Sequence, residues 1–174
     1  GENGIVFNPE KFHFSRDTVD FADFDITLTG YRPTKKMLKA IEEFPSPTNI
    51  TGMRSWFGLV NQVSYTFAQA PTMAPFRELL QHNNKFYWDE TLEQLFQQSK
   101  REILNKIQEG VRTFETNRPT CLTTDWSKAG IGFILSQKHC DCPFTNDPLC
   151  GENHWKTVYA GSRFTRPAET LYAP

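Results

Sequence analysis

The chain has 174 residues, close to the size of one ordinary domain or two small ones. Its 19 Lys and Arg residues nearly balance its 20 Asp and Glu residues, and 38% of its residues are hydrophobic. This composition excludes a disordered polymer and a membrane protein, and a net charge of −1 argues at first against a strongly basic nucleic-acid binder. No apolar stretch approaches the roughly 18 residues that span a bilayer, so we expect no membrane partner.

The charges are unevenly distributed along the sequence. Residues 1–30 carry two basic and six acidic side chains, a net of −4, whereas residues 31–60 carry five basic and two acidic ones, a net of +3. The basic stretch, which includes Lys35 and Lys39, is where a phosphate backbone would be held. The alternative is that these lysines form an ordinary solvated helix face.

Apolar and polar residues alternate between residues 11 and 28, which predicts two β-strands over 11–16 and 19–28. Arg16 and Asp17 would form the turn of this hairpin. Gly30 and Pro33 would end it.

Helical periodicity begins after this hairpin. We expect one helix to end before Pro45 and Pro47, and a second one to begin after Asn49, which is well placed as its N-cap. Gly58 lies inside the second helix, where glycine costs about 1 kcal/mol relative to alanine, so we expect something to pack closely there.

Two prolines, Pro71 and Pro75, predict a loop and then a short apolar turn. Asp89 would cap a third long helix, and Gly110 would end it. Because the connections are short, the three helices predict a small bundle over about 34–110.

A strand pattern returns after Pro119. We expect strands over 121–125, 131–135 and 157–160, with a turn of small residues between the first two. Three antiparallel strands without a covering helix cannot bury both faces of a sheet, so we expect the last domain to be incomplete. The predicted fold class is therefore α+β, with a hairpin, a three-helix bundle and incomplete antiparallel strands.

Asp125 is expected at the end of the first of these strands. A carboxylate in this place can hold Mg²⁺ through oxygen. Two-metal phosphodiester chemistry, however, needs several carboxylates, so from spacing alone an ordinary strand-end aspartate is the simpler interpretation.

The cysteines are clustered rather than evenly spread. Cys140, Cys142 and Cys150 stand close together with His154, and such N and S donors are the ligands that tetrahedral Zn²⁺ prefers. Reduced thiols in a solvent-near loop are the alternative to a zinc site. The spacing is unlike a secreted disulfide framework, so we expect an intracellular protein, cytoplasmic and/or nuclear and not secreted.

Residues 120–137, with Asp-Trp-Ser, Gly-Ile-Gly and Leu-Ser-Gln in that order, resemble the first hairpin of the retrotransposon RNase H domain. Residues 158–174 are similar to that family's third strand and the lead into its first helix. The resemblance implies a catalytic, Mg²⁺-binding role for Asp125. The second catalytic carboxylate of the family is a Glu a few residues further on, so this domain would be truncated.

Residues 49–67 resemble the thumb helix of Ty3/gypsy-type reverse transcriptases, whose pattern Leu-Arg-Ser-Phe-Leu-Gly-Leu-x-Asn is similar to Met-Arg-Ser-Trp-Phe-Gly-Leu-Val-Asn here. The motifs Phe-Pro-x-Pro, Met-Ala-Pro-Phe and Phe-x-Trp flank it in the expected order, and residues 5–11 resemble the end of the palm. The resemblance implies three parts of a Pol polyprotein: palm end over 1–33, thumb or connection bundle over 34–117, and the start of RNase H over 118–174.

The resemblance also assigns nucleic-acid contacts on the thumb helix. In related enzymes one helix face lies against the minor groove of the template–primer, and it corresponds here to Arg54, Gly58, Asn61 and Gln62. Glycine permits close approach, the amides can bond sugars and base edges, and the guanidinium can meet phosphate. Ordinary helix packing with polar surface residues is the alternative.

The hairpin over 19–28 corresponds to the primer grip, with Phe21 and Phe24 as contact residues. The family favours a glycine between these hydrophobic residues, where the present chain has Asp23. A carboxylate there would face a partner that carries phosphates.

The resemblance implies that the parent protein performs RNA-directed DNA synthesis with Mg²⁺ and degrades the RNA strand of the hybrid. Its partners would be an RNA–DNA hybrid or template–primer duplex and the rest of the Pol polyprotein. The polymerase signature Tyr-x-Asp-Asp does not occur in this sequence, so we expect the piece alone neither to polymerise nor to cleave. The alternative is a non-catalytic nucleic-acid-binding or host-adopted protein derived from such an element.

Overall fold

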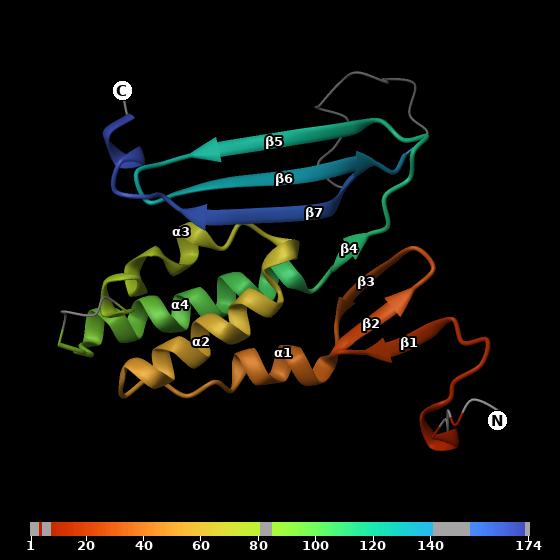
Figure 1. Cartoon of the computed structure of the whole chain (residues 1–174), viewed down its shortest axis with the longest axis horizontal. Coiled ribbons are helices and arrows are strands. Elements are labelled where there is room, and N and C mark those ends of the chain that lie inside the picture. The colour runs from red at the N-terminus through yellow and green to blue at the C-terminus, as the bar shows by residue number, and fades with distance from the viewer. Residues whose placement is uncertain (1–3, 5–7, 81–84, 141–153, 173–174) are drawn as a thin grey trace.

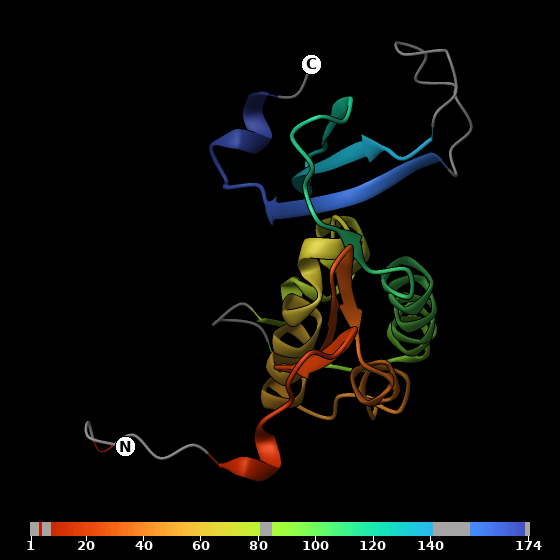
Figure 2. The same ribbon diagram turned by 90° about the vertical axis from the view of Figure 1, so that its right-hand side faces the viewer.

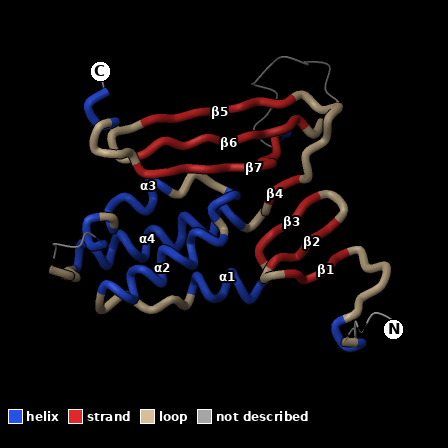
Figure 3. The backbone as a smooth tube through the Cα atoms, in the orientation of Figure 1, coloured by secondary structure: helices blue, strands red, loops and turns tan. Residues whose placement is uncertain are grey.

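The computed structural model describes residues 4, 8–80, 85–140 and 154–172, and it places a helical unit beside one antiparallel sheet and against a second one (Figure 1). The α+β class expected from the sequence is confirmed. Figure 3 shows the division clearly, since the four α-helices form one contiguous group and the strands lie at its end and along one side.

The first sheet has four strands in the order β1-β2-β3-β4. Its members are β1 (Thr18–Phe21), β2 (Phe24–Thr27), β3 (Gly30–Pro33) and β4 (Val111–Arg112). β4 follows the helical unit in the sequence, and its Val111 pairs with Tyr31 of β3. A two-residue strand carries too little alternation to be recognised from the sequence, and it was not expected.

The hairpin turn is formed by Ala22 and Asp23, whose φ angles are 52° and 66°. Positive φ at both central residues matches the right-handed twist of the flanking strands, and this geometry favours two-residue hairpins. The expected strand over 11–16 and the expected turn at Arg16 and Asp17 are therefore wrong. The expected strand over 19–28 is instead two strands, and residues 30–33 continue the sheet rather than ending it.

The three predicted helices are confirmed. They are α1 (Lys35–Glu42), α2 (Ile50–Gln62) and α4 (Glu90–Ile107). The Asn49 side chain accepts a hydrogen bond of 2.8 Å from Gly52 N at the start of α2, and Asp89 accepts one of 2.8 Å from Leu92 N at the start of α4. These bonds satisfy amide groups that the first turn of a helix leaves without a partner.

The segment with the two prolines is helical rather than a loop. It contains α3 (Ala70–Met73) and two single turns of 3₁₀ helix, Ala74–Phe76 and Glu78–Leu80. Both prolines occupy the first turn of their elements, where the missing backbone N–H removes no helical hydrogen bond. The loop prediction was wrong for this reason.

One hydrophobic core holds the helical unit together. The Trp56 ring lies 5.3 Å from Phe44 and 5.0 Å from Phe96, and Phe96 contacts Phe76 at 6.2 Å between ring centroids. The other members buried with them come from all four helices and the turns between them: Met37, Ile41, Met53, Val60, Val63, Phe67, Met73, Leu79, Leu92, Ile103 and Ile107.

The second sheet contains β5 (Thr120–Trp126), β6 (Gly130–Lys138) and β7 (Trp155–Phe164), antiparallel and in that order. These are the three strands expected from the sequence. In the turned view the sheet lies across the helical unit (Figure 2). Gly130 and Gly132 of β6 face the helical unit directly, because a Cβ at these positions would lie 2.8 Å from Ala70 Cβ and 3.1 Å from Ala68 Cβ.

Candidate nucleic-acid interface and carboxylate site

The four residues assigned to the nucleic-acid-binding face of α2 lie on one stripe of the helix. Arg54, Gly58, Asn61 and Gln62 are spaced by four, three and one residues, and all four are exposed. The opposite side of α2 is buried in the core. We call these four residues the α2 stripe.

Gly58 lies in open surroundings within the chain. A Cβ added there would meet no atom within 4 Å, so the expected close packing does not occur within the described residues. The reason is that Gly58 points away from the core, toward solvent. Its missing side chain therefore leaves the backbone of α2 accessible from outside.

Asn61 connects the α2 stripe to the second sheet. Its side-chain oxygen accepts a hydrogen bond of 3.3 Å from Gln69 Nε2. Gln69 stands between Ala68 and Ala70, which contact β6. The polar stripe and the sheet that carries Asp125 are thus joined through a few residues.

The basic side chains of α1 are exposed, and two of them form ion pairs. Lys36 Nζ lies 2.9 Å from the carboxylate of Asp23, and Lys39 Nζ lies 3.6 Å from that of Glu43. The hydrogen bond to Asp23 raises the pKa of Lys36. Lys35 is the first residue of the same helix, and its side chain is open to solvent like that of Lys39.

The hairpin places its two phenylalanines in different environments. Phe21 is 68% exposed, whereas Phe24 is half-buried and packs against the core of the helical unit. Phe24 contacts Tyr65 at 5.4 Å and Tyr31 at 6.3 Å between ring centroids, an aromatic cluster that the sequence did not indicate. Burial raises the pKa of Tyr65, whose hydroxyl is buried without a hydrogen-bond partner.

Asp23 is bound to the helical unit. Its backbone carbonyl accepts a hydrogen bond of 3.0 Å from Thr34 N, in addition to the contact between its carboxylate and Lys36. The carboxylate expected to face a phosphate-bearing partner is thus paired with a cation of this chain.

Asp125 lies near the end of β5, opposite Gly132 of β6. Alternation along β5 places its side chain on the face of the sheet that contacts the helical unit, and it is exposed at the open end of that face. It lines a cavity of about 170 Å³ together with Thr123 and Ser127 of the sheet and with Ala68 and Pro71 of the helical unit.

The donors around Asp125 suit a hard cation only in part. Oxygen atoms from a carboxylate and two hydroxyl side chains are the chemistry that Mg²⁺ prefers. Within the described ranges, however, no group of three or more His, Cys, Asp and Glu side chains comes together. One carboxylate does not make a two-metal site, so no catalytic step follows from the described residues alone.

Two of the four candidate zinc ligands lie outside the described residues. Cys142 and Cys150 belong to the undescribed segment 141–153, whereas Cys140 is half-buried and His154 is exposed. His139 N donates a hydrogen bond of 2.7 Å to the carbonyl of His154, which joins described residues on either side of that segment. The proposed set of four ligands remains a prediction.

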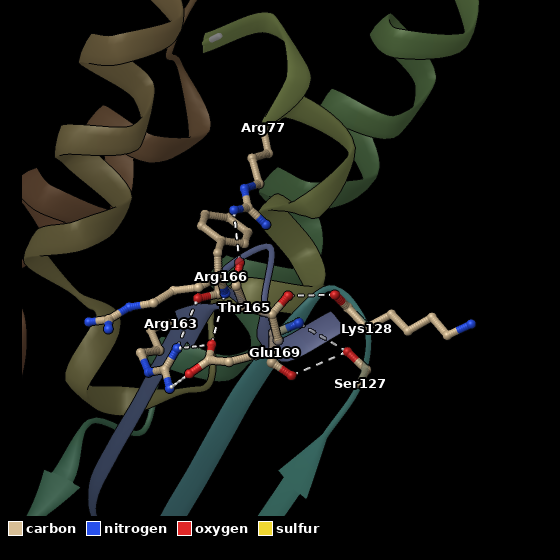
Figure 4. A network of polar contacts seen from close by, with 9 residues as sticks. Arg77, Ser127, Lys128, Arg163, Thr165, Arg166 and Glu169 are labelled. Carbon is tan, nitrogen blue, oxygen red and sulfur yellow. Dashed lines mark hydrogen bonds and ion pairs between the residues drawn. The ribbon is translucent and has the colours of Figure 1, made fainter. Parts of the chain in front are cut away.

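A polar network joins the end of β7 to the turn that follows Asp125 (Figure 4). Both terminal nitrogens of Arg163 donate to Glu169 at 2.7 Å, and Arg166 N donates to the same carboxylate at 2.8 Å. These bonds, chiefly those from Arg163, lower the pKa of Glu169 to about 2.

Comparison with known proteins finds relatives among transposon polyproteins. The polyproteins of transposons Tf2-3 and Tf2-4 of Schizosaccharomyces pombe are each 25% identical over 138 residues, which is 79% of this chain and 10% of the polyprotein. This chain is homologous to retrotransposon polyproteins. The resemblance to Ty3/gypsy-type Pol is thereby confirmed, although no protein-family model matches the sequence.

Solved structures show the same fold as this chain. The foamy viral protease-reverse transcriptase in complex with RNA/DNA hybrid superimposes with a TM-score of 0.68 at 17% identity, over 91% of this chain and 20% of that one. The same viral protein in complex with dsDNA gives a TM-score of 0.66, also at 17% identity, over 91% of this chain and 31% of that one. The segment spans about a tenth of the length of its curated relatives. None of the described helices is long and apolar enough to cross a bilayer.

Proposed function

We propose that this Pol segment binds an RNA–DNA hybrid or a template–primer duplex through the α2 stripe. The observation that carries the proposal is the accessible backbone at Gly58, flanked on one exposed helix face by a guanidinium and two amides. Such a surface can enter a minor groove closely, bond sugars and base edges, and meet phosphate. The fold is shared with a viral protein that was solved on both kinds of duplex, which supports the proposal.

We also propose nucleic-acid contacts on the hairpin and on α1. Phe21 is exposed at the hairpin turn, where it can stack against a base or sugar, and Phe24 anchors the hairpin on the helical unit. Lys35 and Lys39 offer exposed positive charge to a phosphate backbone. In this proposal residues 1–33 end the palm, residues 34–117 form the thumb or connection bundle, and residues 118–174 begin an RNase H domain.

Asp125 is proposed as the first RNase H carboxylate of the parent polyprotein. Bound Mg²⁺ would polarise the scissile phosphate and its attacking water there. Within this chain Asp125, with the nearby hydroxyl groups of Thr123 and Ser127, would supply one part of the metal's oxygen ligands. The segment itself binds duplex without turnover.

The binding proposal is tested by a salt titration of hybrid affinity. Arg54→Ala and Lys39→Ala should each weaken binding and lower the slope of log K against log salt by roughly 0.9 for a lost phosphate contact. Arg101→Ala, which removes an exposed charge from α4, is the matched control and should leave affinity unchanged. An unchanged affinity and slope in Arg54→Ala would remove the α2 stripe from consideration.

The absence of turnover is tested with the purified chain, Mg²⁺ and a labelled hybrid. We expect no cleavage by the unmodified chain. Cleavage that Asp125→Asn abolishes would contradict the proposal, because it would show that this chain holds a complete catalytic site.

A further inference from the structure

Part of the contact between the helical unit and the second sheet is made by backbone and small side chains. Gly130 and Gly132 lie against Ala70 and Ala68, and Ala70 N donates a hydrogen bond of 3.0 Å to Ser162 Oγ of β7. Contact between small residues brings two elements close together, but at these positions no bulky side chains interlock. Directional contacts such as this hydrogen bond are therefore needed to fix their relative position.

Arg77 supplies such a contact at the end of β7. It lies between the two 3₁₀ turns of the helical unit, and its Nη2 donates a hydrogen bond of 2.9 Å to the carbonyl of Thr165. Its guanidinium carbon also lies 4.9 Å from the centre of the Phe164 ring, a cation–π distance (Figure 4). Arg77 therefore holds two successive residues of the sheet.

Phe164 also contacts α2. Its ring centroid lies 6.3 Å from that of Phe57, the neighbour of Gly58 in sequence. The phenyl ring held by Arg77 thus touches the helix that carries the α2 stripe.

Thr165 is hydrogen-bonded to the turn that follows Asp125. It is buried, its backbone N–H donates to the carbonyl of Ala129 at 3.2 Å, and its hydroxyl donates to the carbonyl of Lys128. Ser127 N closes the same turn with a hydrogen bond of 2.9 Å to the carbonyl of Gly130. This turn leaves β5 two residues after Asp125.

We propose that Arg77 is a positioning residue that fixes the distance between the α2 stripe and Asp125. It acts through Phe164 toward α2 and through Thr165 toward the turn over 127–130. The proposal rests on the function proposed above, in which one duplex contacts both the α2 stripe and Asp125. The distance between these two sites therefore matters for binding. Arg77 itself touches neither place.

The geometric part is tested without nucleic acid. Spin labels at Ser55→Cys on α2 and Lys128→Cys in the turn, with the four native cysteines replaced by serine, report the distance between the two places. We expect a single narrow distance distribution in the unmodified background and loss of that narrow peak in Arg77→Ala. Arg77→Lys should restore the peak, because an ammonium group can donate to the same carbonyl and lie over the same ring. A narrow peak in Arg77→Ala would overturn the proposal.

The functional part is tested by attaching an iron chelate at Lys128→Cys and mapping hydroxyl-radical cuts on an end-labelled hybrid. Cuts should cluster when Arg77 is unchanged, spread over neighbouring nucleotides in Arg77→Ala and cluster again in Arg77→Lys. Hybrid affinity should stay the same in all three proteins. Arg101→Ala should give the parental pattern. Clustered cuts in Arg77→Ala would overturn the positioning role. If the chain with Arg77 unchanged binds no hybrid at all, the proposed function fails instead. The spin-label measurement still decides the role of Arg77.

Discussion

At the scale of single residues, the hairpin turn uses two non-glycine residues in a backbone conformation that favours glycine. Ala22 and Asp23 both have positive φ, and Asp23 also pairs with Lys36. The left-handed conformation costs a non-glycine residue about 1–2 kcal/mol. The turn remains in place because Thr34 and Lys36 hold Asp23 against α1.

Two substitutions separate the backbone effect from the ion pair. Asp23→Gly and Asp23→Ala both remove the contact with Lys36, but only glycine adopts positive φ without strain. We expect Asp23→Gly to be more stable than Asp23→Ala by about 1 kcal/mol, after allowing for the greater freedom of glycine in the unfolded chain. Urea unfolding measures the difference, and equal stabilities would show that the turn is not formed as described.

Glu169 gives a residue-scale prediction for pH. Its pKa is lowered from 4.5 to about 2, so the contact with Arg163 stabilises the folded chain above pH 4.5 and is lost as the pH falls toward 2. We therefore compare the free energy of unfolding of the unmodified chain with that of Glu169→Gln. Their difference should be constant above about pH 5 and shrink toward zero in acid. A difference that grows in acid would contradict the assigned bond.

At the scale of elements, α2 combines a buried face that stabilises it with an exposed glycine that weakens it. Gly58 has no neighbour within 4 Å of an added Cβ. We expect Gly58→Ala to raise the free energy of unfolding by about 0.5–1 kcal/mol, because alanine favours a helix interior.

The same substitution should weaken hybrid binding, since a methyl group would stand between the helix backbone and the groove. Thermal unfolding and a hybrid titration on one protein sample measure both effects. Gly52→Ala, in the first turn of α2, is a control outside the α2 stripe, where an added Cβ meets only ordinary contacts of 3.5 Å or more. Stabilisation with unchanged binding would separate Gly58 from the interface.

The elements that were predictable are those with strong periodicity and clear caps. Asn49 and Asp89 mark the starts of α2 and α4 from the sequence, because their side chains satisfy the first helical amides. Pro71 and Pro75 were misread because a proline interrupts a helix only beyond its first turn. The hairpin was misplaced because neither Ala22 nor Asp23 is a glycine, whereas Arg16 and Asp17 have the polarity of a turn.

The candidate site was predictable to a similar degree. The spacing of Arg54, Gly58 and Asn61 already places them on one helix face, and the structure leaves that face exposed. The contacts of Arg77 with Phe164 and Thr165 could not be predicted, because they join segments far apart in the sequence through one backbone carbonyl and one ring.

At the scale of the whole molecule, the packing of the second sheet against the helical unit depends on the absence of a side chain at Gly130. An added Cβ would lie 2.8 Å from Ala70 Cβ and 2.9 Å from the carbonyl oxygen of Arg163. We expect Gly130→Ala to lower the free energy of unfolding by about 1–3 kcal/mol, the usual cost of overpacking. Adding Ala70→Gly should recover only part of the loss, because the Arg163 carbonyl remains in place.

Chemical unfolding followed by tryptophan fluorescence measures this effect, and Gly58→Ala is the matched control with the opposite expected sign. A neutral Gly130→Ala would mean that the sheet does not rest on the helical unit as described.

The pairing of β3 with β4 has a consequence for the order of folding. Tyr31 and Val111 come together only after the whole helical unit has been made, and closing so long a loop is slow compared with forming the local hairpin of β1 and β2. During synthesis the hairpin therefore waits with an unpaired edge at β3 until Val111 leaves the ribosome. The shortest of the described strands thus sets the moment at which the first sheet is complete.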